Sequence, residues 1–179
     1  MRYFLFLITG ISPFFIHGQS DYILLDLDSS KGEYSKMAMQ IWEYAEMGYQ
    51  EVKSSALLQN KLNEAGFTIQ AGVAGIPTAF IAEYNNGGPV IAILGEYDAL
   101  PGLSQKALPY KVTNEGRGGH ACGHHLFGTA SAAAAISLKK YIKKYQVKGT
   151  IRYYGCPAEE GGSGKVYMTR AGLFDDVDV

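Results

Sequence analysis

The sequence is poor in cysteine and has no long run of charge of one sign. Its only two cysteines, Cys122 and Cys156, could form one disulfide at most. Its 16 basic residues nearly balance its 17 acidic residues, for a formal net charge of -1. We therefore expect no binding to nucleic acid or to an anionic membrane surface. The length of 179 residues and the hydrophobic share of 47% instead predict one globular domain with a core of its own.

The apolar run at the N-terminus is short for a membrane span. Met1-Arg2 gives it a positively charged start, residues 3–16 are mostly apolar and uncharged, and Gly18 offers a small residue for cleavage. This is the pattern of a secretory signal peptide. We therefore expect residues 1–18 to be removed, which leaves a secreted or periplasmic chain without stable membrane association. A retained N-terminal anchor or a buried helix is the alternative.

The spacing of apolar residues predicts helices and strands in the remaining chain, residues 19–179. Runs with helical spacing predict helices at residues 35–49, 54–65, 126–145 and 165–171. Short, mostly apolar runs predict strands at residues 78–84, 90–94 and 149–155. The turn residues 85–88, Asn-Asn-Gly-Gly, separate the first two strands and predict a hairpin. This order indicates an α/β fold with a mixed sheet and flanking helices.

Three of the four histidines lie within six residues of one another, together with a cysteine. They are His120, His124 and His125, and Cys122 lies among them. Imidazole and thiolate groups are good ligands for zinc and related divalent ions. His124 comes just before a predicted helix, whose dipole favours the neutral imidazole that a metal requires. Two alternatives are open, namely a histidine-rich loop with ordinary hydrogen bonds and a Cys122–Cys156 disulfide in a structural protein.

Acidic residues follow two of the predicted strands, Asp98 after the second and Glu159-Glu160 after the third. Open α/β sheets place their functional sites beyond the carboxyl ends of the strands. Of two adjacent carboxylates, one can bind a metal ion and the other can take a proton from water. Asp98 could accept a hydrogen bond from a ligand imidazole or bridge two ions. The alternative for Glu159-Glu160 is a solvated loop or the first turn of a helix.

The glycine-rich residues 161–165 fit neither of two motifs with a similar composition. A phosphate-binding loop ending at Lys165 would need glycine in place of Glu159, and Ser or Thr in place of Val166. A nucleophile elbow centred on Ser163 would need glycine at position 165. We therefore expect neither of these two kinds of site in this stretch.

Three motifs, in order along the chain, carry a family resemblance. They are GEYDALPGLSQ (95–105), GGHACGHHLFGTA (118–130) and GCPAEEGGSGKVYM (155–168). Together they resemble the zinc-amidohydrolase and peptidase family of aminoacylases and carboxypeptidase G, over residues 35–179. The resemblance implies a small-molecule amide or peptide substrate, in which the amide joins an acyl group to an amino acid such as glutamate.

The resemblance also implies a role for each candidate site residue. Cys122, His124 and Glu160 match metal ligands of the family. Glu159 matches its general base, and Asp98 matches the aspartate that supports the metal site. The implied cofactor is a divalent metal, with zinc expected before manganese or cobalt, and with one or two ions.

The chain also departs from the pattern of this family. It has Glu96 where broader members have histidine, which leaves the metal count open, and it has His125 where many members have Asp or Asn. Family members run to several hundred residues, with further histidine ligands and a smaller domain for substrate enclosure and homodimer formation. We therefore expect residues 19–179 to be the N-terminal part of a hydrolase catalytic domain. The alternative is a non-catalytic, exported metal-binding remnant of such an enzyme.

Overall fold

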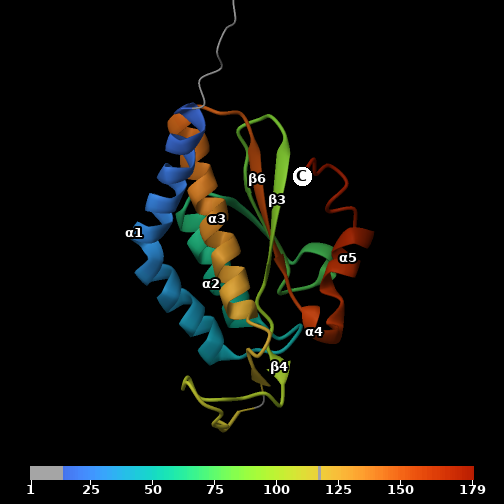
Figure 1. Ribbon diagram of the computed structural model, residues 1–179. Coiled ribbons are helices and arrows are strands. Elements are labelled where there is room, and N and C mark those ends of the chain that lie inside the picture. The colour runs from blue at the N-terminus through green and yellow to red at the C-terminus, as the bar shows by residue number, and fades with distance from the viewer. Residues whose placement is uncertain (1–13, 117) are drawn as a thin grey trace, which may run out of the picture.

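The computed structural model describes residues 14–116 and 118–179, and a mixed four-stranded sheet lies at its centre (Figure 1). The strands, in sheet order, are β1 Thr68–Ala71, β2 Phe80–Tyr84, β6 Thr150–Cys156 and β3 Val90–Glu96. β2 is antiparallel to both β1 and β6, whereas β6 and β3 are parallel. The predicted α/β fold with a mixed sheet is therefore confirmed.

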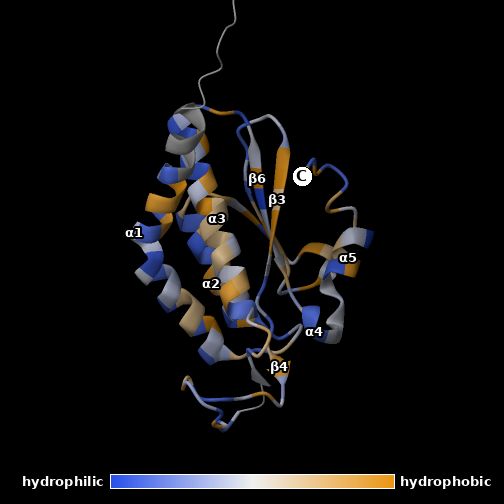
Figure 2. Ribbon diagram, viewed as in Figure 1, coloured by the Kyte–Doolittle hydropathy of each residue, from blue (hydrophilic) through white to orange (hydrophobic). Residues whose placement is uncertain are grey.

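Helices cover the two faces of this sheet unequally (Figure 1). The long helices on one face are α1 Phe14–Tyr44, α2 Val52–Glu64 and α3 His124–Tyr145. The short helices on the other side are α4 Glu159–Gly162 and α5 Gly164–Arg170. The remaining elements are the 3-10 turn η1 Val73–Gly75 and a ribbon of β4 Leu100–Pro101 and β5 Gly118–Gly119. In Figure 2 much of α3 and β3 is coloured hydrophobic, whereas α4 is hydrophilic.

Alternate residues of β6 enter two separate cores, because successive side chains of a strand point to opposite faces. Ile151 and Tyr153 belong to the larger core, with residues of α1, α2 and α3. Tyr154 and Cys156 belong to the smaller core, with Met168 of α5. All five side chains are 0% exposed. β6 is therefore covered on both faces, which suits a central strand.

The predicted hairpin between β2 and β3 is wrong. β6 lies between these strands, antiparallel to β2 and parallel to β3. The turn at residues 85–88 instead passes around the start of β6, where Thr150 N donates a hydrogen bond to Pro89 O (2.9 Å). Turn residues set a change of chain direction, but the burial of β6 on both faces decides which strands become neighbours.

Helix α1 starts earlier and ends sooner than the predicted helix at residues 35–49. It spans Phe14–Tyr44, and it ends where Ala45 takes a positive φ of 44°. Of the expected signal peptide, residues 1–13 lie outside the described part of the chain and residues 14–18 are helical. Cleavage and export therefore remain predictions. No helix within the described residues is long and apolar enough to cross a membrane.

The other predicted helices and strands are confirmed to within a few residues. They correspond to α2, α3, α5, β2, β3 and β6. Gly66 and Gly172 follow α2 and α5 with positive φ values of 81° and 72°, as expected for residues that end helices.

Candidate metal centre

The carboxyl ends of β3 and β6 bring the predicted acidic residues together. The two strands are parallel, with Glu96 opposite Cys156. Asp98 follows β3, and α4 begins with Glu159 just after β6. The backbone amide of Glu160 donates a hydrogen bond to Asp98 Oδ2 (2.8 Å). The acids therefore meet beyond the carboxyl ends of neighbouring strands, as predicted.

His124 is the first residue of α3, and its ring reaches the same edge of the sheet. Gly128 allows the helix to come close, because a Cβ at this position would lie 2.4 Å from Glu96 O. His124 Nδ1 lies 2.8 Å from Asp98 Oδ1, and His124 Nε2 lies 2.9 Å from Glu96 Oε2. Of the two roles considered for Asp98, the structure thus shows the hydrogen bond to an imidazole.

The three predicted ligands, Cys122, His124 and Glu160, each place one donor atom within 4.8 Å of the others. Glu160 Oε1 is buried and has no hydrogen-bond partner among the described residues. Buried polar atoms in proteins are nearly always paired. An unpaired carboxylate oxygen beside a thiol and an imidazole fits a divalent cation, which takes ligands of these kinds. The residues present therefore suit a metal ion.

A second group with donor atoms within 4.8 Å consists of Glu96, His124 and Glu159. Glu159 Oε2 lies 3.7 Å from His124 Nε2, and the Glu159 side chain is 42% exposed, compared with 18% for Glu160. The adjacent glutamates therefore have different surroundings. An exposed carboxylate beside the donor atoms can reach both water and a substrate, whereas the more buried one suits a ligand.

Interactions between the site residues shift three pKa values. Burial alone would raise the pKa of Asp98, but hydrogen bonds from His124 and from the Glu160 amide lower it below its usual value. The hydrogen bond to Asp98 raises the pKa of His124, against the opposing effect of burial. The Glu160 carboxylate raises the pKa of the Cys122 thiol. The hydrogen bond to Asp98 therefore acts against the effect expected of the helix dipole on His124, and cation binding here requires the release of protons.

Two residues that the sequence did not assign to the site also contact it. Glu96 lies beside His124, and its carboxylate forms an ion pair with Lys165 of α5. The alternation of side chains along an extended chain could have indicated Glu96, because it lies two residues before Asp98. Lys165 begins the predicted helix at residues 165–171, and no spacing in the sequence connects it with the site.

The remaining cysteine and histidines belong to neither donor group. His120 is 5% exposed, and its Nε2 lies 3.0 Å from Ile41 O. The His125 ring lies against it, with ring centroids 5.0 Å apart. Burial lowers the pKa of His120 to about 4 and also lowers that of His125. Cys156 is buried, Cys122 is exposed and both are free, so the disulfide alternative is wrong.

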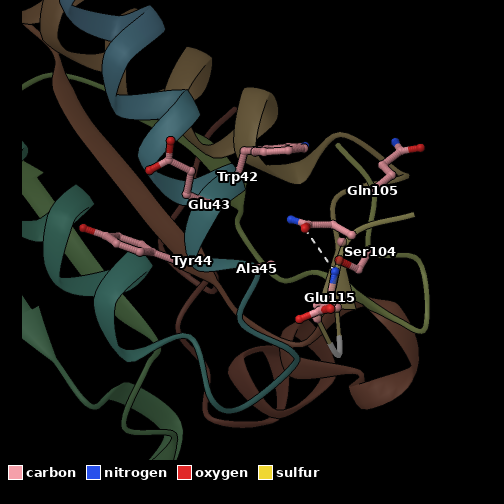
Figure 3. Close-up of a pocket in the computed structure, with 11 residues that line it drawn as sticks. Trp42, Glu43, Tyr44, Ala45, Ser104, Gln105 and Glu115 are labelled. Atoms are coloured by element: carbon pink, nitrogen blue, oxygen red, sulfur yellow. Dashed lines mark hydrogen bonds between the residues drawn. The ribbon is translucent and has the colours of Figure 1, made fainter. Parts of the chain in front are cut away.

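A cavity of about 330 Å³ lies next to the β4–β5 ribbon (Figure 3). Its lining includes Trp42 and Glu43 at the end of α1 and Ser104, Gln105 and Glu115 in the loop that joins β4 to β5. None of the candidate ligands lines this cavity. We therefore assign it no part in the chemistry of the metal centre.

Comparisons with known proteins agree with this geometry. Residues 92–179 match the sequence pattern of Peptidase family M20/M25/M40. One of the subunits of the p-aminobenzoyl-glutamate hydrolase of Escherichia coli is 52% identical over 155 residues, which are 85% of this chain and 32% of that protein. The chain belongs to the M20 peptidase family. The family resemblance seen in the three motifs is therefore confirmed.

Two further relatives extend the comparison. The hippurate hydrolase of Campylobacter jejuni is 33% identical, over 87% of this chain and 38% of that protein. A solved Bacillus subtilis M20 protein, described as a dinuclear metal-binding peptidase, has a TM-score of 0.70 and 32% identity, over 84% of this chain and 41% of that one. The chain thus spans well under half the length of these relatives.

Proposed function

We propose that this chain carries the metal centre of a hydrolase that cleaves the amide bond between an acyl group and an amino acid. The observation that carries the proposal is the convergence of Cys122, His124 and Glu160, with a buried carboxylate oxygen that has no partner in the described residues. The names of two relatives support the substrate class, since p-aminobenzoyl-glutamate and hippurate both join an aromatic acyl group to an amino acid. N-acyl amino acids of this kind are therefore the expected substrates.

The donor set also guides the choice of metal. A divalent cation bound there would supply Lewis acidity, which polarises the scissile carbonyl and stabilises negative charge on its oxygen. A thiolate, an imidazole and a carboxylate favour zinc. Manganese and cobalt are the alternatives, with one ion or two.

Glu159 and Asp98, beside the donor set, have separate roles in proton transfer and in orienting the proposed ligands. Glu159 acts as the general base: it takes a proton from the attacking water and later donates a proton to the leaving nitrogen. Asp98 orients His124 by accepting a hydrogen bond from its Nδ1. His124 Nε2 then faces the carboxylates of Glu159 and Glu160, at 3.7 and 3.9 Å. Asp98 Oδ2 also accepts a hydrogen bond from the Glu160 amide, so one aspartate orients two of the proposed ligands.

Export is part of the proposal and rests on the signal-peptide pattern of residues 1–18. Expression in a bacterial host, followed by N-terminal sequencing of the protein outside the cytoplasm, tests it. A new N-terminus near Gln19 is the expected result. An intact Met1 on protein retained in the cytoplasm would contradict export.

The metal site is tested by elemental analysis of the purified chain beside a Cys122→Ala/His124→Ala variant. Near-stoichiometric metal in the wild type and its loss in the variant are expected. Hydrolysis of p-aminobenzoyl-glutamate and hippurate is then measured for the product of the full reading frame, with Glu159→Gln as the second variant. Loss of hydrolysis with metal retained in Glu159→Gln would support the base assignment. Bound metal without hydrolysis would favour the non-catalytic remnant, and no bound metal would overturn the proposal.

A further inference from the structure

The loop between α1 and α2, residues 45–51, lies against both strand ends that form the candidate centre. Beyond β3, Ala99 N donates a hydrogen bond to Glu46 O (2.8 Å). Beyond β6, the Tyr49 hydroxyl donates a hydrogen bond to Gly162 O in α4. A single loop that contributes no donor atom to the centre therefore contacts the segments that do.

Glu51 ends this loop, and its side chain is 0% exposed although neither donor group includes it. Its Oε1 accepts a hydrogen bond from Ala158 N (2.8 Å), and its Oε2 accepts one from the Thr78 hydroxyl (3.0 Å). Burial raises the pKa of this carboxyl group. Fully buried acids are rare unless their oxygens are paired, so these two hydrogen bonds explain how Glu51 is accommodated.

Glu51 is also the N-cap residue of α2, but its side chain makes no hydrogen bond to that helix. Glu46 takes that role, because its carboxylate accepts hydrogen bonds from Lys53 N (3.0 Å) and Ser54 N (2.8 Å). The partners of Glu51 instead lie 27 and 107 residues away along the chain. Its carboxylate therefore connects distant segments and does not stabilise the local helix.

Ala158 sets the direction in which residues 159–160 leave β6. Its φ of 54° and ψ of 45° lie in the left-handed region, which residues other than glycine rarely adopt. The loop packs closely against it, since a Cβ at Gly48 would lie 3.0 Å from Ala158 Cα. The hydrogen bond to Glu51 fixes the amide of Ala158 in this unusual conformation.

We propose that Glu51 is a positioning residue for the metal centre: by holding the Ala158 amide, it sets where the Glu159 and Glu160 carboxylates lie relative to His124. The inference rests on the proposed function for the identity of the centre. The contacts that hold the backbone at Ala158 do not depend on that identity, so they can be tested with and without metal.

The chemistry of the Glu51 side chain indicates which substitution should preserve the backbone conformation at Ala158. A carboxylate offers acceptor oxygens to both of its donors, whereas glutamine offers one oxygen and one amino group. In Glu51→Gln the side-chain oxygen can still accept the hydrogen bond from the Ala158 amide. The side-chain amino group can donate a hydrogen bond to the Thr78 hydroxyl. In Glu51→Ala both donors lose their partner. Rescue by glutamine therefore separates a positioning role from a requirement for negative charge.

The first test is a cobalt titration of the purified, chelator-treated chain, since Co²⁺ occupies zinc sites and gives a visible spectrum. Glu51→Ala should weaken Co²⁺ binding by at least about tenfold and alter the thiolate–cobalt bands, because misplaced supporting groups typically lower metal affinity by this order. Glu51→Gln should remain within about threefold of the wild type. The matched control is Glu46→Ala, an acid in the same loop whose carboxylate bonds to α2 alone. Equal losses in Glu46→Ala and Glu51→Ala, or an unchanged spectrum in Glu51→Ala, would overturn the proposal.

The second test needs no metal and uses amide hydrogen exchange measured by NMR. In Glu51→Ala the exchange of the Glu160 amide, which bonds to Asp98 Oδ2, should accelerate at least about tenfold more than that of the Tyr154 amide within β6, whose rate reports the loss of global stability. A chain that binds no cobalt but shows this local change would contradict the proposed function and leave the positioning role standing. Equal acceleration at both amides would mean that Glu51 stabilises the fold as a whole, which would contradict the positioning role.

Discussion

Two pairs of glutamates lie beside the candidate centre, one in the α1–α2 loop and one in α4, and their oxygens are used differently. Both oxygens of Glu46 and both oxygens of Glu51 accept hydrogen bonds from backbone amides or hydroxyls. In contrast, Glu160 Oε1 is buried without a hydrogen-bond partner in the described residues, and the Glu159 side chain is 42% exposed. Paired acids hold structure together, whereas an unpaired buried acid is available for a ligand.

This difference predicts opposite consequences of substitution. Changes in the loop pair or its partners that leave buried donors, buried acceptors or a helix end unpaired should reduce the free energy of unfolding. Changes in the α4 pair should leave the metal-free fold intact and reduce binding or catalysis.

The largest effect is expected for Glu160→Ala, which should weaken zinc binding by at least about 100-fold because it removes one of the three proposed ligands. The free energy of unfolding of the metal-free chain should change by less than about 1 kcal/mol, since Oε1 has no partner to lose within the described residues. Competition with a chromophoric chelator measures the first quantity, and urea unfolding in EDTA measures the second. A loss of several kcal/mol in the metal-free variant would place Glu160 among the structural acids.

The next largest effect is expected for Thr78→Val, which removes the hydroxyl that donates to Glu51 Oε2. The buried carboxylate oxygen then lacks its partner, which should lower the free energy of unfolding by about 2 kcal/mol. The control is Thr169→Val, because the Thr169 hydroxyl bonds to Lys165 O on the exposed side of α5 and its loss should change stability by less than about 0.5 kcal/mol. Equal urea midpoints for the two variants would show that the Glu51 network contributes little.

The residues that form the candidate centre could be predicted from the sequence, because each is indicated by residues close to it along the chain. Cys122 and His124 lie two residues apart, and Glu159-Glu160 and Asp98 each follow a strand. The general rule that open α/β sheets place their sites beyond the carboxyl ends of the strands was enough to expect these residues near one another, although the neighbouring strands were not identified. The local pattern thus predicts the residue types and the end of the sheet where they lie, whereas their individual roles came from the family resemblance.

The acids that build the centre could not be predicted, because their partners are distant in the sequence. Glu51 bonds to Ala158 across 107 residues, and no local spacing indicates this contact. The hairpin prediction fails for the same reason. The turn at residues 85–88 is a local signal, whereas the placement of β6 between β2 and β3 depends on a strand that comes more than 60 residues later.

A smaller effect is expected for Glu46→Ala, which removes the carboxylate that caps the first turn of α2. Loss of a helix cap typically lowers the free energy of unfolding by about 1 kcal/mol. Zinc affinity should stay within about threefold of the wild type, because no oxygen of this carboxylate contacts α4 or the donor atoms. Thermal unfolding followed by circular dichroism, together with a chelator titration, measures both. A large loss of zinc affinity would mean that the whole loop, and not Glu51 alone, positions the centre.

The smallest effect is expected in the pH dependence of stability, where Glu51→Gln is compared with the wild type. Burial raises the pKa of Glu51 in the folded chain above its ordinary value of 4.5. Below pH 4.5 the carboxyl group is protonated in both the folded and the unfolded state, so it adds no pH dependence. As the pH rises through 4.5, the unfolded chain releases this proton while the folded chain retains it, which favours unfolding until the pH passes the raised pKa.

Glutamine cannot lose a proton, so Glu51→Gln should gain stability relative to the wild type as the pH rises from 4.5, and the difference should level off above the folded pKa. Urea unfolding of both chains between pH 4.5 and 7 measures this difference, and contributions from the shared acids cancel. A difference that stays constant with pH would show that the Ala158 amide and the Thr78 hydroxyl fully compensate the burial of the charge. In that case Glu51 is ionised at no net cost in the fold, and its two hydrogen bonds are stronger than the direction of its pKa indicates.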